Sequence, residues 1–165
     1  MKEGFLVGGS LIIAGLLLQM SVGPVVWDVF RWPVNGIVLA GFLLLVTIIF
    51  LLRKTVYAFQ FIGTTNAAIP ALVYAVVLTI LMGLTRQTVD GVWLHNMLSC
   101  WPFVLVYVYI AVILGQIILR RTLHFQWKRD VPFLLNHLGL FLAITTATLG
   151  NADMQRLKMM TVKGE

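Results

Sequence analysis

Charged residues and cysteine are both scarce in this sequence of 165 residues, and each scarcity excludes a class of protein. Only 11% of the residues are charged while 60% are hydrophobic, whereas soluble domains are about 25% charged and about 45–50% apolar. An ordinary soluble domain is therefore excluded. The single cysteine, Cys100, excludes an internal disulfide, a CxxC redox pair and a thiolate metal cluster, and it leaves the redox compartment open.

Acidic side chains are missing from the apolar stretches of the chain. The aspartates all fall in loops or at the ends of these stretches: Asp28, Asp90, Asp130 and Asp153. A charged group at membrane depth is costly and usually functional, so their positions argue against an acidic relay for proton or cation transport. The sequence also contains no glycine-rich phosphate loop, no paired carboxylates and no Ser-His-Asp pattern.

Long apolar stretches dominate what the chain does contain. A helix needs about 20 mainly apolar residues to cross the hydrocarbon core of a bilayer. Five stretches approach that length: residues 5–26, 36–52, 67–84, 97–119 and 131–149. The segments between them are too short to fold as domains. The sequence therefore predicts an all-α, polytopic transmembrane bundle of five helices, forming one membrane domain over residues 1–165.

Proline and glycine bear on the ends of these helices. Gly23 and Pro24 can kink or stop the first helix, so its far end is the least defined. Pro70, Pro102 and Pro132 are expected in the first turns of their helices, where a missing N–H costs little. Glycines within the stretches are expected to allow close helix packing; they include Gly8, Gly9, Gly15, Gly36, Gly41, Gly115 and Gly139.

Basic residues predict the orientation, because short cytoplasmic loops carry an excess of lysine and arginine. With the N-terminus inside, the inner side holds Lys2, Arg53, Lys54, Arg120, Arg121, Lys128 and Arg129. The outer loops hold only Arg31 and Arg86, although the basic tail after the fifth helix opposes this bias. All five tryptophans fall near predicted helix ends, as in an interfacial aromatic belt. We predict a cytoplasmic N-terminus and an extracytoplasmic tail over residues 150–165.

His137 is the exception to the lack of ionisable groups within the apolar stretches. It lies about two turns into the fifth stretch, on the side predicted to face the cytoplasm. A neutral imidazole there could ligate haem iron through one nitrogen while the other is held by a hydrogen bond. The alternative is a histidine hydrogen-bonded to a neighbouring helix. His95 and His124 lie at other levels, which argues against paired haem ligands as in a diheme core, and both are interpreted as interfacial.

The segment from Arg120 to Arg129 mixes basic and aromatic residues, a composition that also occurs in RNA-binding surfaces. A juxtamembrane segment lying against anionic lipid is the simpler interpretation. We therefore expect the lipid bilayer as a partner and no nucleic acid.

The second half of the chain resembles a known family in several short stretches. These are residues 99–103 (SCWPF), 119–121 (LRR), 132–141 (PFLLNHLGLF) and 151–156 (NADMQR). They resemble the membrane region of ResB-type proteins, also called CcsB-type, of system II cytochrome c biogenesis. The resemblance runs over residues 95–165, and the first three hydrophobic stretches match only in being hydrophobic.

The resemblance implies a role in cytochrome c maturation in a bacterial plasma membrane. In that family a ResB-type subunit works with a CcsA-type partner to move haem outward and attach it to apocytochrome c. His137 matches the family's inward-facing haem ligand in local sequence, in helix position and in predicted sidedness, and Asn136 is a candidate for orienting it. The chain is expected to be an accessory subunit rather than an enzyme on its own.

The chain also departs from the family pattern. Members usually continue into an extracytoplasmic domain and a further helix, whereas this chain stops at Glu165, so it is expected to be a fragment or a short form. The tryptophan-rich motif of the CcsA-type partner is absent, and a second haem ligand would come from that partner. Two other functions stay open, a small multi-pass transporter subunit and a cofactor-free anchor of a membrane redox complex.

Overall fold

The computed structural model describes residues 1–88, 93–150 and 153, and within them the chain is all-α. The helices are α1 (Lys2–Val22), α2 (Val34–Leu52), α3 (Tyr57–Ile62), α4 (Thr65–Leu84), α5 (Trp101–Thr122) and α6 (Trp127–Leu149), with 3-10 turns η1 (Trp27–Phe30), η2 (Trp93–His95) and η3 (Met97–Ser99). Helices α1, α2, α4, α5 and α6 are long and apolar enough to cross a membrane. The predicted five-span bundle is confirmed. Two predicted features lie outside the described residues. They are Asp90 and the tail over residues 150–165, of which only residues 150 and 153 are described.

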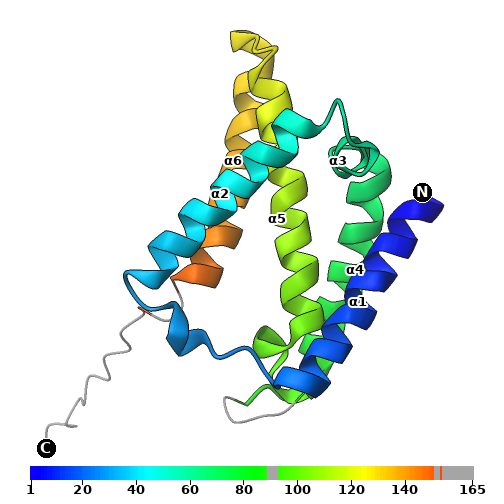
Figure 1. Cartoon of the computed structure of the whole chain (residues 1–165), viewed down its shortest axis with the longest axis vertical. Helices are drawn as coiled ribbons and strands as arrows, with labels where there is room; N and C mark the ends of the chain where they lie inside the picture. The colour runs from blue at the N-terminus through cyan, green and yellow to red at the C-terminus, as the bar shows by residue number, and fades with distance from the viewer. Residues whose placement is uncertain (89–92, 151–152, 154–165) are drawn as a thin grey trace, which may run out of the picture.

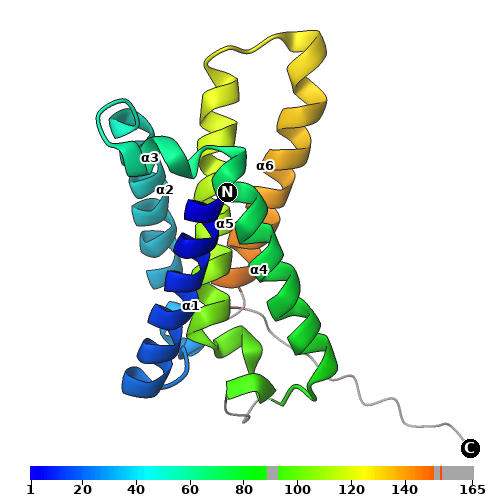
Figure 2. The ribbon, with the colours of Figure 1, turned by 90° about the vertical axis from the view of Figure 1, so that its right-hand side faces the viewer.

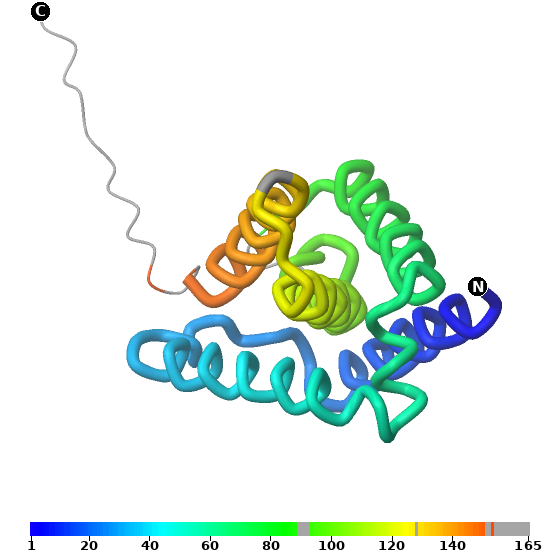
Figure 3. The backbone as a smooth tube through the Cα atoms, turned by 90° about the horizontal axis from the view of Figure 1, so that it is seen from above, coloured from blue at the N-terminus to red at the C-terminus, as the bar shows by residue number. Residues whose placement is uncertain are grey.

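Helix α5 occupies the centre of the bundle. The view from above shows α1, α2, α4 and α6 placed around it (Figure 3), and the side view shows it running through the middle of the molecule (Figure 1). Within its most apolar 18-residue stretch, 56% of α5 is buried, compared with 28% or less in each of the other four spans. The outer helices all contact α5, and α1 also packs on α4; their remaining surfaces face the space that lipid would fill.

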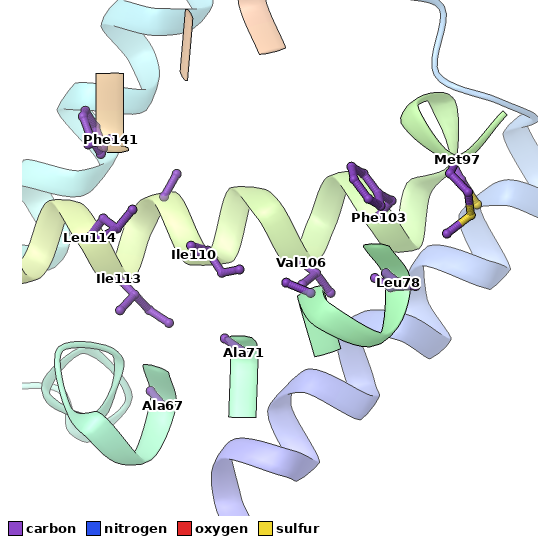
Figure 4. Packing of buried hydrophobic residues seen from close by; sticks show 13 residues of the cluster. Ala67, Ala71, Leu78, Met97, Phe103, Val106, Ile110, Ile113, Leu114 and Phe141 are labelled. Atoms are coloured by element: carbon purple, nitrogen blue, oxygen red, sulfur yellow. The ribbon is translucent and has the colours of Figure 1, made fainter. Parts of the chain in front are cut away.

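Small residues allow the outer helices to lie close to α5. Ala67 and Ala71 of α4 are one helical turn apart, and both are 1% exposed against the α5 side chains (Figure 4). On α1, a Cβ atom added to Gly15 would lie 2.5 Å from the backbone nitrogen of Pro102 and 2.6 Å from its Cα. Close approach through small residues is how helices commonly pack in membranes, where hydrophobicity alone does not drive them together.

At two boundaries the helix is four residues shorter than predicted, for local physical reasons. Helix α1 ends at Val22, because Gly23 adopts a positive φ of 83°. Helix α5 begins at Trp101 instead of residue 97, because Cys100 has an extended backbone that separates α5 from the turn η3. Pro102 lies in the first turn of α5, as predicted. The short helix α3 and the three 3-10 turns lie in or next to segments predicted to be loops.

The placement of two prolines in the first turns was wrong. Helices α4 and α6 begin earlier than predicted, at Thr65 and Trp127, so Pro70 and Pro132 are the sixth residues of their helices. Pro70 cannot donate the helical hydrogen bond to the Asn66 carbonyl. That carbonyl lies against Gly4 of α1, and a Cβ on Gly4 would also lie 2.7 Å from Pro70 Cγ. The interrupted turn of α4 is therefore the place where the start of α1 packs.

Two buried glutamines join the helices by hydrogen bonds. Gln19 is 5% exposed, and its Oε1 accepts the backbone N–H of Trp101 at 3.1 Å, which satisfies a donor at the start of α5. Gln116 is fully buried, and its Nε2 donates to the Val46 carbonyl of α2 at 2.8 Å. Both side chains are uncharged, so neither stands out among the ionisable residues of the sequence.

Candidate functional site

His137 lies on α6 with one ring nitrogen held and the other open. Its Nδ1 lies 2.9 Å from the carbonyl oxygen of Phe133, one turn earlier. A carbonyl oxygen only accepts, so Nδ1 donates in this contact, and in the neutral imidazole Nε2 then carries the lone pair. Histidines that ligate a metal through one ring nitrogen usually have the other nitrogen held in this way. The half-buried imidazole, when neutral, can therefore present Nε2 as a metal ligand.

An aromatic and cationic stack fixes the plane of the imidazole. The rings of Phe133 and His137 are stacked, with centroids 3.9 Å apart and 24° between their planes. The guanidinium of Arg121, from the end of α5, lies 5.3 Å from the centroid of the Phe133 ring. A cation within about 6 Å of an aromatic face is attracted by it. Arg121, Phe133 and His137 thus form a continuous stack that links the two helices.

Asp130 anchors this stack at the start of α6. Its carboxylate is fully buried, forms an ion pair with Arg121, and accepts a hydrogen bond from Arg129 Nε at 3.1 Å. It also accepts the backbone N–H of Gln126 at 2.8 Å, at the N-terminal end of α6. The sequence predicted Asp130 at a helix end, where it lies, but gave no indication that this carboxylate would hold Arg121 over Phe133.

The α5–α6 hairpin carries this cluster at the end of the bundle that extends furthest from the rest of the molecule (Figure 2). His137 follows Asp130 by seven positions on α6, which corresponds to about 10 Å along a helix. His137 therefore lies on α6 between the charged hairpin and the apolar part of the helix.

The other predicted site residues lie apart from His137 or do not contact it. Asn136 is exposed, and within the described part of the structure no hydrogen bond joins its amide to His137. The Phe133 carbonyl, and not Asn136, contacts Nδ1 of His137. The orienting role of Asn136 stays a prediction. His95 lies in η2 with Nδ1 3.0 Å from the Arg86 carbonyl, and His124 lies exposed in the α5–α6 turn. The three histidines thus belong to three different elements.

The residues around His137 fit a single axial bond to haem iron. In the described residues no group of three or more His, Cys, Asp or Glu side chains could hold a bare metal ion. Haem already supplies four nitrogen ligands to its iron, so one open imidazole nitrogen is sufficient on one face. A site with one protein ligand is consistent with haem and does not fit a tetrahedral zinc centre.

A lateral apolar groove lies away from His137, toward the opposite end of the bundle. It has a volume of about 630 Å³ and lies where α2, α5 and α6 meet, with Trp27 and Leu98 also in its wall. The volume is within the range of small-molecule sites, about 300–1,000 Å³. No histidine of the described residues lines it. The groove and the imidazole are therefore separate features.

The architecture places the chain in a broad class, the multi-pass α-helical membrane proteins. Five described helices qualify as membrane spans by length and composition. No protein-family model matches the chain, and comparisons with curated proteins and with solved structures gave no match either. A more specific function therefore depends on the site itself and on the resemblance of its local sequence.

Proposed function

We propose that this chain is a haem-handling membrane subunit of cytochrome c maturation, in which Nε2 of His137 ligates the haem iron. The observation that carries the proposal is the hydrogen bond from Nδ1 to the Phe133 carbonyl, which makes Nε2 the nitrogen that a neutral imidazole offers to iron. The stretch around His137, residues 132–141, also belongs to the part of the sequence that resembles ResB-type proteins. Geometry and local sequence thus support the same residue independently.

The side chains around His137 would hold and orient its imidazole, the proposed ligand of the haem iron. Phe133 restricts rotation of the imidazole by stacking on one of its faces. Asp130 and Arg121 fix Phe133 in turn, because they join the ends of α5 and α6. Haem itself would become joined, through thioether bonds, to the cysteine thiols of apocytochrome CxxCH motifs. This chain contributes binding and presentation, and a CcsA-type partner would supply the second ligand and the site of attachment.

The proposal includes an orientation in a bacterial plasma membrane. His137 lies near the same end of the bundle as Arg53, Lys54, Arg120 and Arg121, which the positive-inside rule assigns to the cytoplasm. Haem would then reach His137 from the cytoplasmic side. The N-terminus would also lie inside, because Tyr57 of α3, on the segment that follows Arg53 and Lys54, donates a hydrogen bond to Glu3 at the start of α1.

Substitution of the proposed ligand tests the function directly. His137→Ala should reduce the haem that co-purifies with the detergent-solubilised chain, with or without a CcsA-type partner, by at least about tenfold, a loss typical of disturbing a metal ligand or its support. Absorption spectra with haem quantification give the measurement. Added imidazole should partly restore the signal of the variant, since it replaces the missing ring.

His95→Ala is the matched control, because it removes an imidazole from the other end of the bundle. It should retain the haem content of the unmodified chain. Equal haem in both variants, or no haem in any preparation, would contradict the proposal. The second of these results would leave the cofactor-free anchor or the transporter subunit, and uptake by reconstituted vesicles would distinguish them.

A further inference from the structure

A second polar site, formed by other residues than those around His137, lies at the ends of α2, α3 and α5. It is a pocket of about 460 Å³ lined by Arg53, Lys54, Gln60, Arg120, Leu123 and His124. In the described part of the chain, every ion pair joins an aspartate to Arg31, Arg121 or Arg129. Among the described residues, the three cations of the pocket therefore have no carboxylate to neutralise them.

The central cation of this pocket is held in place by the backbone. Arg120 donates from Nη1 to the Gly63 carbonyl and from Nη2 to the Gln60 carbonyl, both at 2.9 Å. Its Nε is buried and has no hydrogen-bond partner among the described residues. Gly63 makes room for the guanidinium, because a Cβ there would lie 2.6 Å from Nε. Nε is out of reach of the pocket, but Nη1 and Nη2 each keep a second N–H, so Arg120 can still donate to an added acceptor.

The other two cations differ in how firmly they are placed. Arg53 is partly buried, donates to the Phe50 carbonyl at 2.9 Å, and stacks its guanidinium 3.7 Å above the Phe50 ring. Lys54 is exposed at the mouth of the pocket. Two oriented guanidinium groups with an adjacent ammonium form the kind of donor set that binds phosphate oxygens.

We propose that this pocket binds a phosphate group, with Arg120 and Arg53 as the oriented donors and Lys54 as a neutralising charge at the mouth. The phosphate could belong to an anionic phospholipid headgroup or to a soluble phosphate compound, since both present the same oxygens. Basic pockets between membrane helices commonly bind anionic headgroups. The pocket does not involve His137, so it stands whether or not the chain handles haem.

Three variants of the delipidated, full-length chain in detergent test the pocket. Arg120→Gln should weaken binding of phosphatidylglycerol, measured by native mass spectrometry, by at least about tenfold, because a charge-assisted hydrogen bond is lost. Lys54→Gln should weaken it by about fivefold; this exposed residue keeps the test valid if Arg120→Gln does not fold. Gly63→Ala keeps every charge but displaces Arg120, so it should also weaken binding. Lys2→Gln, which removes an exposed charge at the same end of the bundle, is the control.

The probes distinguish the two sources of phosphate. Preference for phosphatidylglycerol over phosphatidylcholine that the pocket variants lose and Lys2→Gln retains supports a headgroup site. Stabilisation against heat by inorganic pyrophosphate, lost in the same variants without any lipid preference, supports a site for a soluble phosphate. Equal behaviour of the unmodified chain and the pocket variants toward both probes overturns the proposal. An equal loss in Lys2→Gln also overturns it, because the effect would then be one of net charge.

Discussion

Gly15→Leu should strongly destabilise the bundle, because it forces α1 away from the start of α5. The Cβ alone would lie 2.5–2.6 Å from backbone atoms of Pro102, and backbone cannot rotate away as a flexible side chain does. Overpacking of this kind costs about 1–3 kcal/mol even where neighbours can adjust, and we expect the upper part of that range. Thermal unfolding in detergent gives the size of the effect, and hydrogen exchange in α1 should increase more than in α6.

Gly41→Leu is the matched control for that experiment. Gly41 lies in α2 and is exposed, and apart from its chain neighbours and the backbone of its own helix, no described atom lies within 4 Å of the position that a Cβ would take. The same change of residue should therefore leave the unfolding temperature close to that of the unmodified chain. If Gly15→Leu is tolerated equally well, α1 does not pack on the start of α5 as described.

Asp130→Ala should produce the second large loss of stability. The substitution leaves Arg121 and Arg129 without their carboxylate and leaves the backbone N–H of Gln126 without its acceptor. The two arginine side chains are 37% and 60% exposed, so water can solvate the charges that remain, and the main cost is the lost anchoring of the hairpin and of the Gln126 N–H. We expect the unfolding temperature to fall by about 5 °C. The α5–α6 hairpin should become the part of the chain most open to proteolysis.

A surface aspartate separates this effect from a general loss of negative charge. Asp28 pairs with Arg31 three residues away, and both side chains are mostly exposed, 77% and 67%. Exposed pairs of this kind contribute little, so Asp28→Ala should behave like the unmodified chain. Similar losses in the two variants would mean that the hairpin is not held by Asp130. The Asp130 variant should also bind less haem, since Arg121 would no longer hold Phe133 against His137.

Hydropathy was sufficient to predict the five spans but not their arrangement. The mean hydropathy of α5 is 2.4, between the values of 2.3 for α4 and 2.6 for α2. Nothing in these values distinguishes a helix surrounded by protein from one surrounded by lipid, because both environments are apolar. Glycine spacing was only partly informative. Gly8 and Gly15 lie at close contacts, as predicted, whereas Gly139 has open space around it among the described atoms.

The candidate site could be predicted only in part, because the sequence does not show which distant segments meet. His137 was identified because ionisable residues are rare in membrane spans, and its Phe133 carbonyl partner lies one helical turn away. Asp130 and Arg121 are nine residues apart across a turn, so their pairing depends on how the hairpin closes. The basic pocket joins Arg53 to Arg120 and depends on the packing of α2, α3 and α5. Interactions between distant segments need a tertiary structure, whereas interactions within one helix follow from its periodicity.

The central position of α5 has a consequence for the order in which the chain assembles. A chain is made from its N-terminus, at about 5–20 residues per second, so α1, α2 and α4 are synthesised before their common neighbour. Until then Gln19 lacks the Trp101 N–H that it accepts in the finished bundle. Helices α1 and α4 can already pack on each other at Gly4 and Gly8, but the surfaces that face α5 have no protein partner. Assembly of the bundle is therefore completed late in synthesis, and a chain that ends before residue 101 contains three spans without the helix that they share.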